Sequence, residues 1–293
     1  MTIKLGKIID FDCTYDYSIG MFKEVTKNTN LQFPEAYKQG EGMATLAKAL
    51  KDYDKAPFCE LPFCHTVEGE AMGGKINYGD EKIGPRAAEY VFTTAEEILA
   101  LPEIDYSKGR ISEVLKACKY LRENGENVLL NVSGPFTILD CLIDPRHLFK
   151  IFKKNPEAME KIFNKFQIEI LRFVEEAQKS GVNMISYADS SGGLNILGPK
   201  FSEQTVEMFT YPLLKNMEQI ITDQTIVLFC PKTTYALLGT DRAVWKEIQL
   251  SGPMNYAQAC LEVIGKTKFL GQICIKNKDI ELKNGIVKAV ALL

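Results

Sequence analysis

Two cysteines stand at the ends of strand-like segments and could together bind a metal ion. Cys230 ends the apolar run TIVLFC (225–230), and Cys274 lies in KFLGQICI (268–275). Zinc accepts thiolate, imidazole and carboxylate ligands, and a catalytic zinc site uses three protein ligands with one open position. A thiolate pair plus one further side chain would meet that need. Both cysteines could equally be small buried packing residues, a common role of cysteine in a reducing compartment.

A third ligand or an acid–base group could come from ELPFCHTVEGEAMGG (60–74). This segment places His65 close to Glu68, so that an imidazole and a carboxylate are available together. The sequence contains one other histidine, His147. That residue follows a proline at the start of a helical pattern and is expected to face solvent. We therefore take His65 as the candidate metal ligand or catalytic residue, together with Glu68.

Two further groups of polar residues follow strand-like runs. NVLLNVSG (127–134) leads into the loop formed by Ser133, Gly134, Pro135, Phe136 and Thr137, and VNMISYAD (182–189) leads into Asp189 and Ser190. In a barrel of parallel strands the chemistry lies where the strands end and the loops begin. Asp189 is therefore a candidate catalytic carboxylate, and the loop residues and Ser190 are candidates for binding a substrate.

The elements that must position these residues alternate along the chain. Strand-like runs are expected at 7–11, 127–134, 182–189, 225–230 and 268–275. Helices are expected over 42–53, 111–124 and 156–180, where apolar residues recur at three- and four-residue steps. The strands are continuous apolar runs, which is typical of parallel sheets covered on both faces. Alternation of such strands with helices predicts an α/β fold.

A closed barrel is favoured over an open sheet that binds nucleotides. No GxGxxG or GxxxxGK[ST] motif follows any strand, and barrels of this class typically run to about 250 residues. The prediction is a single (β/α)8 TIM barrel over residues 1–293, with about 1–80 forming helices and a hairpin packed on it.

Composition restricts the classes of partner. The net charge of −3, with no cluster of basic residues, argues against a nucleic-acid partner. The first eighteen residues carry acids and no long apolar core, so no signal peptide is expected. No run approaches the roughly 20 apolar residues that cross a bilayer. A cytoplasmic protein is expected.

Four ordered segments carry a resemblance to a known superfamily. They are FPEAYKQGEGMATLAKAL (33–50), LPFCHTVEGEAMGGKINYGD (61–80), NVSGPFTIL (131–139) and GVNMISYADSSGGLNILGPKFSE (181–203). With these segments the chain resembles the uroporphyrinogen decarboxylase superfamily, and within it the methylcobamide:coenzyme M methyltransferase group. The resemblance covers most of the chain.

The resemblance implies a (β/α)8 barrel that transfers a methyl group between a small substrate and a corrinoid (cobalamin) carried by a separate protein. It also implies zinc bound by a histidine–x–cysteine pair and a later cysteine. Cys230 matches the first cysteine, and Cys274, which follows sooner than the later cysteine of the group, is the candidate for the second. Zinc lowers the pKa of a bound thiol and so prepares it for attack on a methyl carbon. The small molecule could be a methyl donor or a thiol acceptor.

The chain departs from the pattern of that group around the first cysteine. Leu228 stands where the group has histidine, and Pro231 stands where glycine is usual. The third ligand is therefore open among His65, Glu68 and Asp189. Two alternative functions also stay open: a metal-free decarboxylase with Asp189 or Glu68 stabilising a protonated pyrrole, and a non-catalytic subunit that binds a corrinoid protein.

Overall fold

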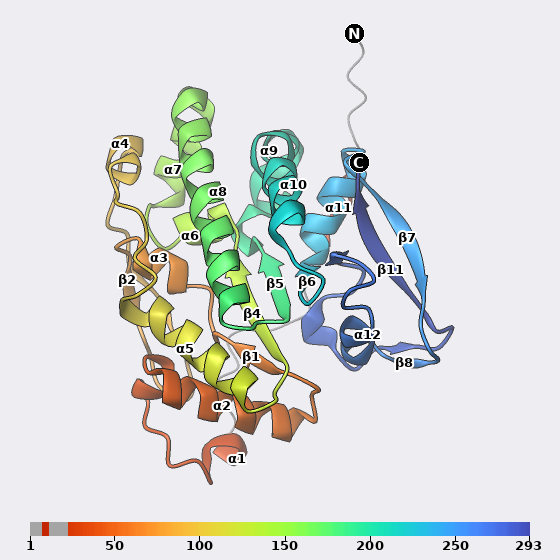
Figure 1. Cartoon of the computed structure of the whole chain (residues 1–293). Coiled ribbons are helices and arrows are strands. Elements are labelled where there is room, and N and C mark those ends of the chain that lie inside the picture. The colour runs from red at the N-terminus through yellow and green to blue at the C-terminus, as the bar shows by residue number, and fades with distance from the viewer. Residues whose placement is uncertain (1–7, 12–22) are drawn as a thin grey trace. The chain divides into compact units, whose positions relative to one another are not determined.

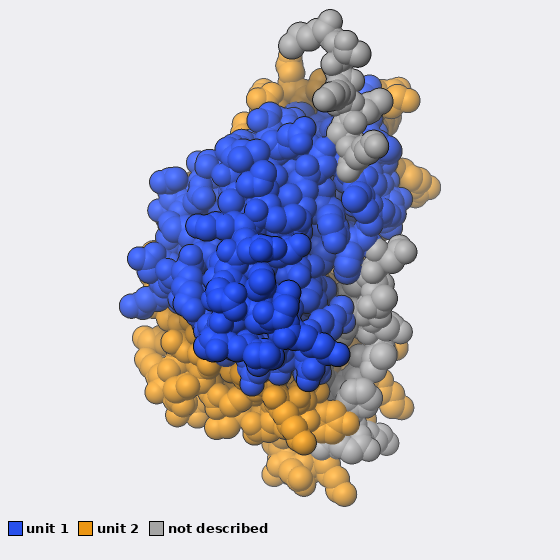
Figure 2. Space-filling model, turned by 90° about the vertical axis from the view of Figure 1, so that its right-hand side faces the viewer, with its two compact units in different colours: residues 1–14, 186–293 blue, residues 15–185 orange. Residues whose placement is uncertain are grey.

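The structure, a computed structural model, describes residues 8–11 and 23–293 and divides into two compact units (Figures 1 and 2). Unit 1 contains the described residues 8–11 and 186–293, and unit 2 contains residues 23–185. Strand β5 (Met184–Ala188) crosses the boundary between them.

Unit 2 is an α/β unit built on a parallel strand pair and a separate hairpin (Figure 1). Strand β1 (Cys59–Leu61) runs parallel to β4 (Val128–Ser133), and β2 (Lys75–Asn77) pairs antiparallel with β3 (Arg86–Glu89). The helices of this unit are α1 (Lys23–Thr26), η1 (Glu35–Tyr37), α2 (Gly40–Asp54), α3 (Val67–Ala71), α4 (Ala95–Leu99), α5 (Gly109–Glu123), α6 (Pro135–Leu139), α7 (Pro145–Lys154) and α8 (Pro156–Lys179).

The longest helix, α8, begins and ends where its sequence provides the signals. The Asn155 side chain accepts the N–H of Ala158 at 3.1 Å, and Pro156 occupies the first turn, where its missing N–H costs nothing. After the helix, Gly181 adopts a φ of 79°, a conformation that glycine enters without strain. The buried face of α8 includes Phe163, whose ring lies 5.8 Å from that of Phe136 and 5.9 Å from that of Phe152. Each aromatic side chain buried in this way contributes about 1.5–3 kcal/mol.

Unit 1 contains a sheet of mixed direction. Its strands lie in the order β6 (Ile226–Phe229), β9 (Phe269–Leu270), β11 (Ile286–Leu292) and β7 (Ala243–Gln249). Strands β6 and β9 are parallel, whereas β11 runs antiparallel to both β9 and β7. The remaining elements are η2 (Ser190–Gly192), α9 (Leu194–Thr205), the π-helix η3 (Val206–Thr210), α10 (Tyr211–Ile220), α11 (Pro231–Gly239), β8 (Met254–Asn255), α12 (Tyr256–Glu262), η4 (Ile275–Asn277) and β10 (Glu281–Leu282).

The predicted α/β fold with parallel strands is confirmed, with three differences in its elements. The run KIIDF forms no strand over residues 8–11, and Lys7 lies outside the described residues. The expected strand 268–275 is reduced to Phe269–Leu270. Strands β1, β7 and β11 were not predicted. In the described part of unit 1 the strand order is linear, from β6 to β7, and the single closed barrel stays a prediction.

The structure also bears on the expectation about membranes. Among residues 8–11 and 23–293, no helix combines the length and the hydropathy that crossing a bilayer requires.

Candidate functional site

The end of β5 carries two polar residues of unit 1, Tyr187 and Asp189. The N–H of Cys230 donates to the carbonyl oxygen of Tyr187 at 2.9 Å. Cys230 is the N-cap residue of α11, so this hydrogen bond holds the start of that helix against the end of β5. Asp189 occupies the same position before η2.

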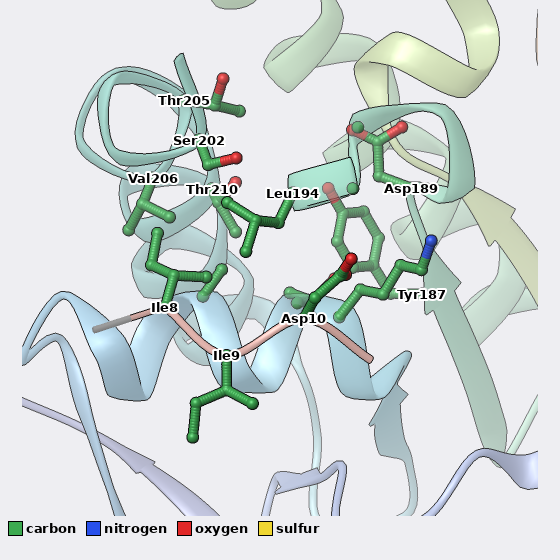
Figure 3. Close-up of a pocket in the computed structure, with 15 residues that line it drawn as sticks. Ile8, Ile9, Asp10, Tyr187, Asp189, Leu194, Ser202, Thr205, Val206 and Thr210 are labelled. Atoms are coloured by element: carbon green, nitrogen blue, oxygen red, sulfur yellow. The ribbon is translucent and has the colours of Figure 1, made fainter. Parts of the chain in front are cut away.

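Asp189 lines a pocket that lies wholly within unit 1 (Figure 3). The lining comes from the segment after β5, from α9 with the π-helix η3, from α11, and from residues 8–10. Figure 3 shows Ser202, Thr205 and Thr210 on one wall and Tyr187 and Asp189 on the other. The lining residues are Ile8, Ile9, Asp10, Tyr187, Asp189, Gly192, Gly193, Leu194, Ser202, Thr205, Val206, Thr210, Lys232, Thr233 and Ala236.

Two hydroxyl groups of this lining are buried without a hydrogen-bond partner among the described residues. They are Tyr187 Oη and Ser202 Oγ, on side chains that are 1% and 4% exposed. A buried hydroxyl that makes no hydrogen bond costs about 1–3 kcal/mol. Native structures keep few such groups, so a pair in one pocket indicates a place where a ligand completes the hydrogen bonding.

The pKa of Tyr187 is raised well above its ordinary value, chiefly by burial and secondly by the negative charge of Asp189. The phenol is therefore neutral at physiological pH and keeps its proton. A neutral phenol can donate one hydrogen bond and accept others. Tyr187 can thus hydrogen-bond a polar atom in the pocket while Asp189 supplies charge.

The loop after β5 approaches α11 closely at Gly193. Lys232 Nζ donates to Asn195 Oδ1 at 3.0 Å across this loop. A Cβ atom on residue 193 would lie 2.7 Å from Asn195 Oδ1 and 2.9 Å from Lys232 Nζ. Glycine at this position is therefore what allows the lysine to reach the asparagine.

Residues 8–11 complete one side of the pocket. In Figure 3 the segment from Ile8 to Asp10 runs beside α11. The ring of Phe11 stacks on that of Tyr235 in α11, with centroids 6.3 Å apart. This contact holds Asp10 at the pocket, far in sequence from the other lining residues.

Cys230 and Cys274 lie beyond the same ends of two neighbouring parallel strands. The register of β6 and β9 pairs Leu228 with Leu270. Cys230 follows β6 directly, and Cys274 lies four residues beyond β9 as the N-cap residue of η4. Both cysteines thus follow the carboxyl ends of neighbouring parallel strands, and their joint role as metal ligands stays a prediction.

The described side chains do not gather into a complete zinc site. Across residues 8–11 and 23–293, no three histidine, cysteine, aspartate or glutamate side chains gather as metal ligands. A catalytic zinc site needs three protein ligands. Zinc binding by Cys230, Cys274 and a further ligand stays a prediction.

In unit 2, Glu68 and Ser133 form a buried pair. The Ser133 N–H donates to Glu68 Oε1 at 2.7 Å, and its hydroxyl donates to Oε2 at 3.2 Å. Burial raises the pKa of Glu68, and the hydrogen bonds from Ser133 oppose that shift without cancelling it. Since Glu68 is 3% exposed, its contact with Ser133 fixes the start of the 133–137 loop.

The rest of this loop packs into the core of unit 2. Gly134 is the N-cap residue of α6, and Pro135 takes its first position. Phe136 is 2% exposed and packs on the rings of α7 and α8. Thr137 is also buried, and its carbonyl oxygen accepts a weak hydrogen bond from Cys141 Sγ at 3.7 Å. Binding of a substrate or a corrinoid by Ser133–Thr137 and by Ser190 stays a prediction.

The segment around His65 is organised by an arginine that the sequence reading missed. Arg110 of α5 donates to Glu70 Oε2 at 2.5 Å, to Thr66 Oγ1 at 2.6 Å and to Cys64 Sγ at 3.1 Å. Its guanidinium also lies 5.4 Å from the centre of the Tyr78 ring. Nothing in the pattern of α5 marks this residue, which precedes the apolar positions by one.

His65 lies half-buried in this segment, and burial lowers its pKa to about 4. The imidazole is therefore neutral at pH 7, the form that binds metals and accepts protons. The sequence predicted a role for His65 in metal binding or acid–base chemistry, and that role stays a prediction.

The lowered pKa gives a testable pH dependence of stability. The unfolded chain protonates His65 below about pH 6.5, whereas the folded chain does so only near pH 4. The contribution to stability is therefore present above pH 6.5 and is lost as pH falls toward 4. Between pH 7 and pH 5, the free energy of unfolding of the wild type should therefore fall by about 2 kcal/mol more than that of His65→Gln.

Urea unfolding at both pH values measures this difference. The exposed His147 provides the control: His147→Gln should show the same pH dependence as the wild type. Equal pH dependence in all three proteins would contradict burial as the cause of the shift.

Comparisons with known proteins show the family to which the chain belongs. A family model for Uroporphyrinogen decarboxylase (URO-D) matches residues 20–246. The chain is 24% identical over 254 residues to the methylcobamide:CoM methyltransferase MtaA of Methanosarcina barkeri, a match covering 85% of this chain and 74% of that protein. It is also 24% identical over 215 residues to MtbA of Methanosarcina acetivorans, covering 72% of this chain and 62% of that one.

The fold of the chain is also similar to that of a solved structure. A methyltransferase from Methanosarcina mazei superposes with a TM-score of 0.65 at 22% identity, covering 76% of this chain and 66% of that one. The family model, however, spans well over half of the residues, including Glu68, Asp189 and Cys230. The chain belongs to the uroporphyrinogen decarboxylase family.

Proposed function

We propose that the protein is a methyltransferase that moves a methyl group between a corrinoid and a small molecule. The observation that carries the proposal is the pocket at the ends of β5 and β6. It is lined by Asp189 and by Lys232, which follows Cys230 by two positions in the sequence. The chain matches a methylcobamide:CoM methyltransferase over 254 residues. Asp189 orients the small molecule, and the corrinoid, carried by a partner protein, meets it at this edge of the sheet.

The finer features of the proposal follow the sequence analysis. They are a (β/α)8 barrel, a corrinoid protein as partner, a methyl donor or a thiol as the small molecule, and a cytoplasmic location. The parallel strand pairs and the similarity to a solved methyltransferase support the barrel. In the reaction, the bond between the methyl carbon and the methyl donor breaks, and the donor keeps the electron pair. The methyl acceptor supplies the electron pair for the new bond to the methyl carbon.

The test is a methyl-transfer assay with the whole chain and free cobalamin. Methylcobalamin is offered with thiols as acceptors, and reduced cobalamin is offered with methylated amines, ethers and thioethers. Visible absorbance follows the methylation state of the cobalt in both directions. Turnover in either direction that depends on the protein supports the proposal, and its absence with every compound overturns it.

Zinc binding is a separate prediction that rests on Cys230 and Cys274 and on a further ligand. We expect about one zinc per chain in the purified protein, as for a structural or catalytic site of this metal. Cys230→Ser and Cys274→Ser should each lower that content by about tenfold or more, because one thiolate ligand is lost. Elemental analysis measures the content in all variants.

Cys260→Ala is the matched control, because Cys260 is fully buried in α12. Its zinc content should equal that of the wild type. A wild-type protein that binds no added zinc would remove the zinc prediction, whereas the methyl-transfer assay would still decide the function.

A further inference from the structure

We propose that the pocket of unit 1 binds a small protonated N-methyl amine, with Asp189 and Asp10 supplying the charge and Tyr187 and Ser202 the hydrogen bonds. This inference rests on the proposed function, in which the amine is the methyl-carrying small molecule. Its carbon–nitrogen bond breaks, nitrogen keeps the electron pair, and the methyl carbon bonds to the reduced cobalt of the corrinoid, which supplies two electrons. A neutral amine is released.

The charges of the lining favour a cation. The lining contains two carboxylates, those of Asp10 and Asp189, and one ammonium, that of Lys232, so its formal charge is negative. The lysine already donates to Asn195 Oδ1 at 3.0 Å. Near a protein surface the effective dielectric constant is about 20, so unlike charges attract more strongly there than in bulk water. An anion entering here would meet two like charges.

The buried hydroxyls favour a ligand that carries N–H groups. Tyr187 Oη and Ser202 Oγ have no hydrogen-bond partner in the described parts of the chain, although their side chains are almost fully buried. Each oxygen can accept an N–H from an ammonium, and hydrogen bonds to charged groups are stronger than neutral ones. The raised pKa of Tyr187 keeps the phenol neutral, so it adds no further negative charge to those of Asp10 and Asp189.

The remaining lining favours a ligand with methyl groups. Side chains of Ile8, Leu194, Val206 and Ala236 contribute apolar surface to the same pocket. Methyl groups of an amine can pack on these side chains while its N–H groups reach the hydroxyls. A quaternary ammonium ion lacks the N–H groups. The ammonium ion has no methyl groups and would leave the apolar side chains of the pocket exposed to water.

The experiment measures binding to the whole chain, without corrinoid, by ligand-observed NMR. The probes are dimethylammonium chloride, its uncharged counterpart 2-propanol, and acetate. We expect dimethylammonium to bind with a dissociation constant of the order of 1 mM, near the limit for three heavy atoms. Binding of 2-propanol and acetate should be at least about tenfold weaker.

Variants assign the binding to this pocket. Tyr187→Phe and Asp189→Asn should each weaken dimethylammonium binding by about tenfold or more. Tyr187→Phe should also leave the melting temperature of the free protein unchanged or raised, because it removes a buried hydroxyl that makes no hydrogen bond. A structural role for that hydroxyl would instead lower it. Asp241→Asn, an exposed position in the same unit, is the control and should bind as the wild type does.

Three results overturn the inference. The first is binding of 2-propanol or acetate as tight as that of dimethylammonium. The second is dimethylammonium binding that Tyr187→Phe and Asp189→Asn leave intact. The third is methyl transfer from other compounds with no amine binding, which keeps the function. Amine binding with no methyl transfer in either direction of the assay would keep this binding site and remove the function.

Discussion

Asp189→Asn is expected to lower the rate of methyl transfer by about 100-fold or more, the usual effect of removing one preorganised charge from an active site. The substitution keeps the shape of the side chain and removes its charge. Asp189 follows β5 directly and lines the pocket beside Tyr187. A carboxylate at this position can orient a polar or charged substrate, whereas the amide cannot balance a positive charge. The measurement is the initial rate of cobalamin methylation or demethylation at saturating substrate.

Asp241→Asn is the matched control for this experiment. Asp241 is exposed and has a φ of 57°, a conformation that asparagine tolerates as well as aspartate does. Its rate should stay within about twofold of the wild type, as for a surface substitution that touches no site. If Asp189→Asn gave a rate as high as this control, Asp189 would have no role in the reaction.

Arg110→Met is expected to destabilise the fold by about 3–5 kcal/mol, the usual cost of removing one partner of a buried ion pair. The Arg110 side chain is 3% exposed and its partner Glu70 is 21% exposed. Methionine fills much of the volume but donates no hydrogen bond, so Glu70, Thr66 and Cys64 all lose a donor. Urea unfolding followed by circular dichroism measures the loss.

The exposed ion pair of Arg146 with Asp144 provides the comparison. The Arg146 side chain is 88% exposed, and its guanidinium lies 2.6 Å from the carboxylate. Because exposed pairs contribute at most about 1 kcal/mol, Arg146→Met should have a small effect. Equal losses in the two variants would show that burial does not determine the contribution of Arg110.

The sequence predicted the elements whose signals are local. Helix α8 has a side-chain cap at Asn155, a proline at its first position and a long apolar face, and it forms over Pro156–Lys179 as expected. Strands β4, β5 and β6 are continuous apolar runs that appear close to their predicted limits. These patterns determine structure through residues that are close in the sequence, so a single sequence is enough to recognise them.

The missed strands lack that local signal. Strand β7 reads AVWKEIQ, with charges in its middle, and it pairs only with β11 among the described strands. Strand β1 has three residues and gains its regular form from pairing with β4. The expected strand at 268–275 stops at Gly271, where a Cβ atom would lie 2.1 Å from Thr234 Oγ1. Contacts distant in sequence determine all three.

The candidate site shows the same division. The sequence singled out Asp189, which lines the pocket, because a carboxylate after an apolar run is visible in the sequence. Ser202 and Tyr187 were not found, because one is an ordinary position of α9 and the other an ordinary position of β5. Their meaning comes from burial without a hydrogen-bond partner, which only three-dimensional packing reveals. Asp10 joins the pocket from residues remote in the sequence.

The position of β11 has a consequence for synthesis of the polypeptide. Strand β11 lies between β9 and β7, yet it is made after both. A nascent chain therefore exposes the hydrogen-bonding edge of β7 until residues 286–292 leave the ribosome. Exposed strand edges invite pairing with other chains. Any shortened version that stops before residue 286 should keep that edge of β7 unpaired and accumulate as insoluble aggregates.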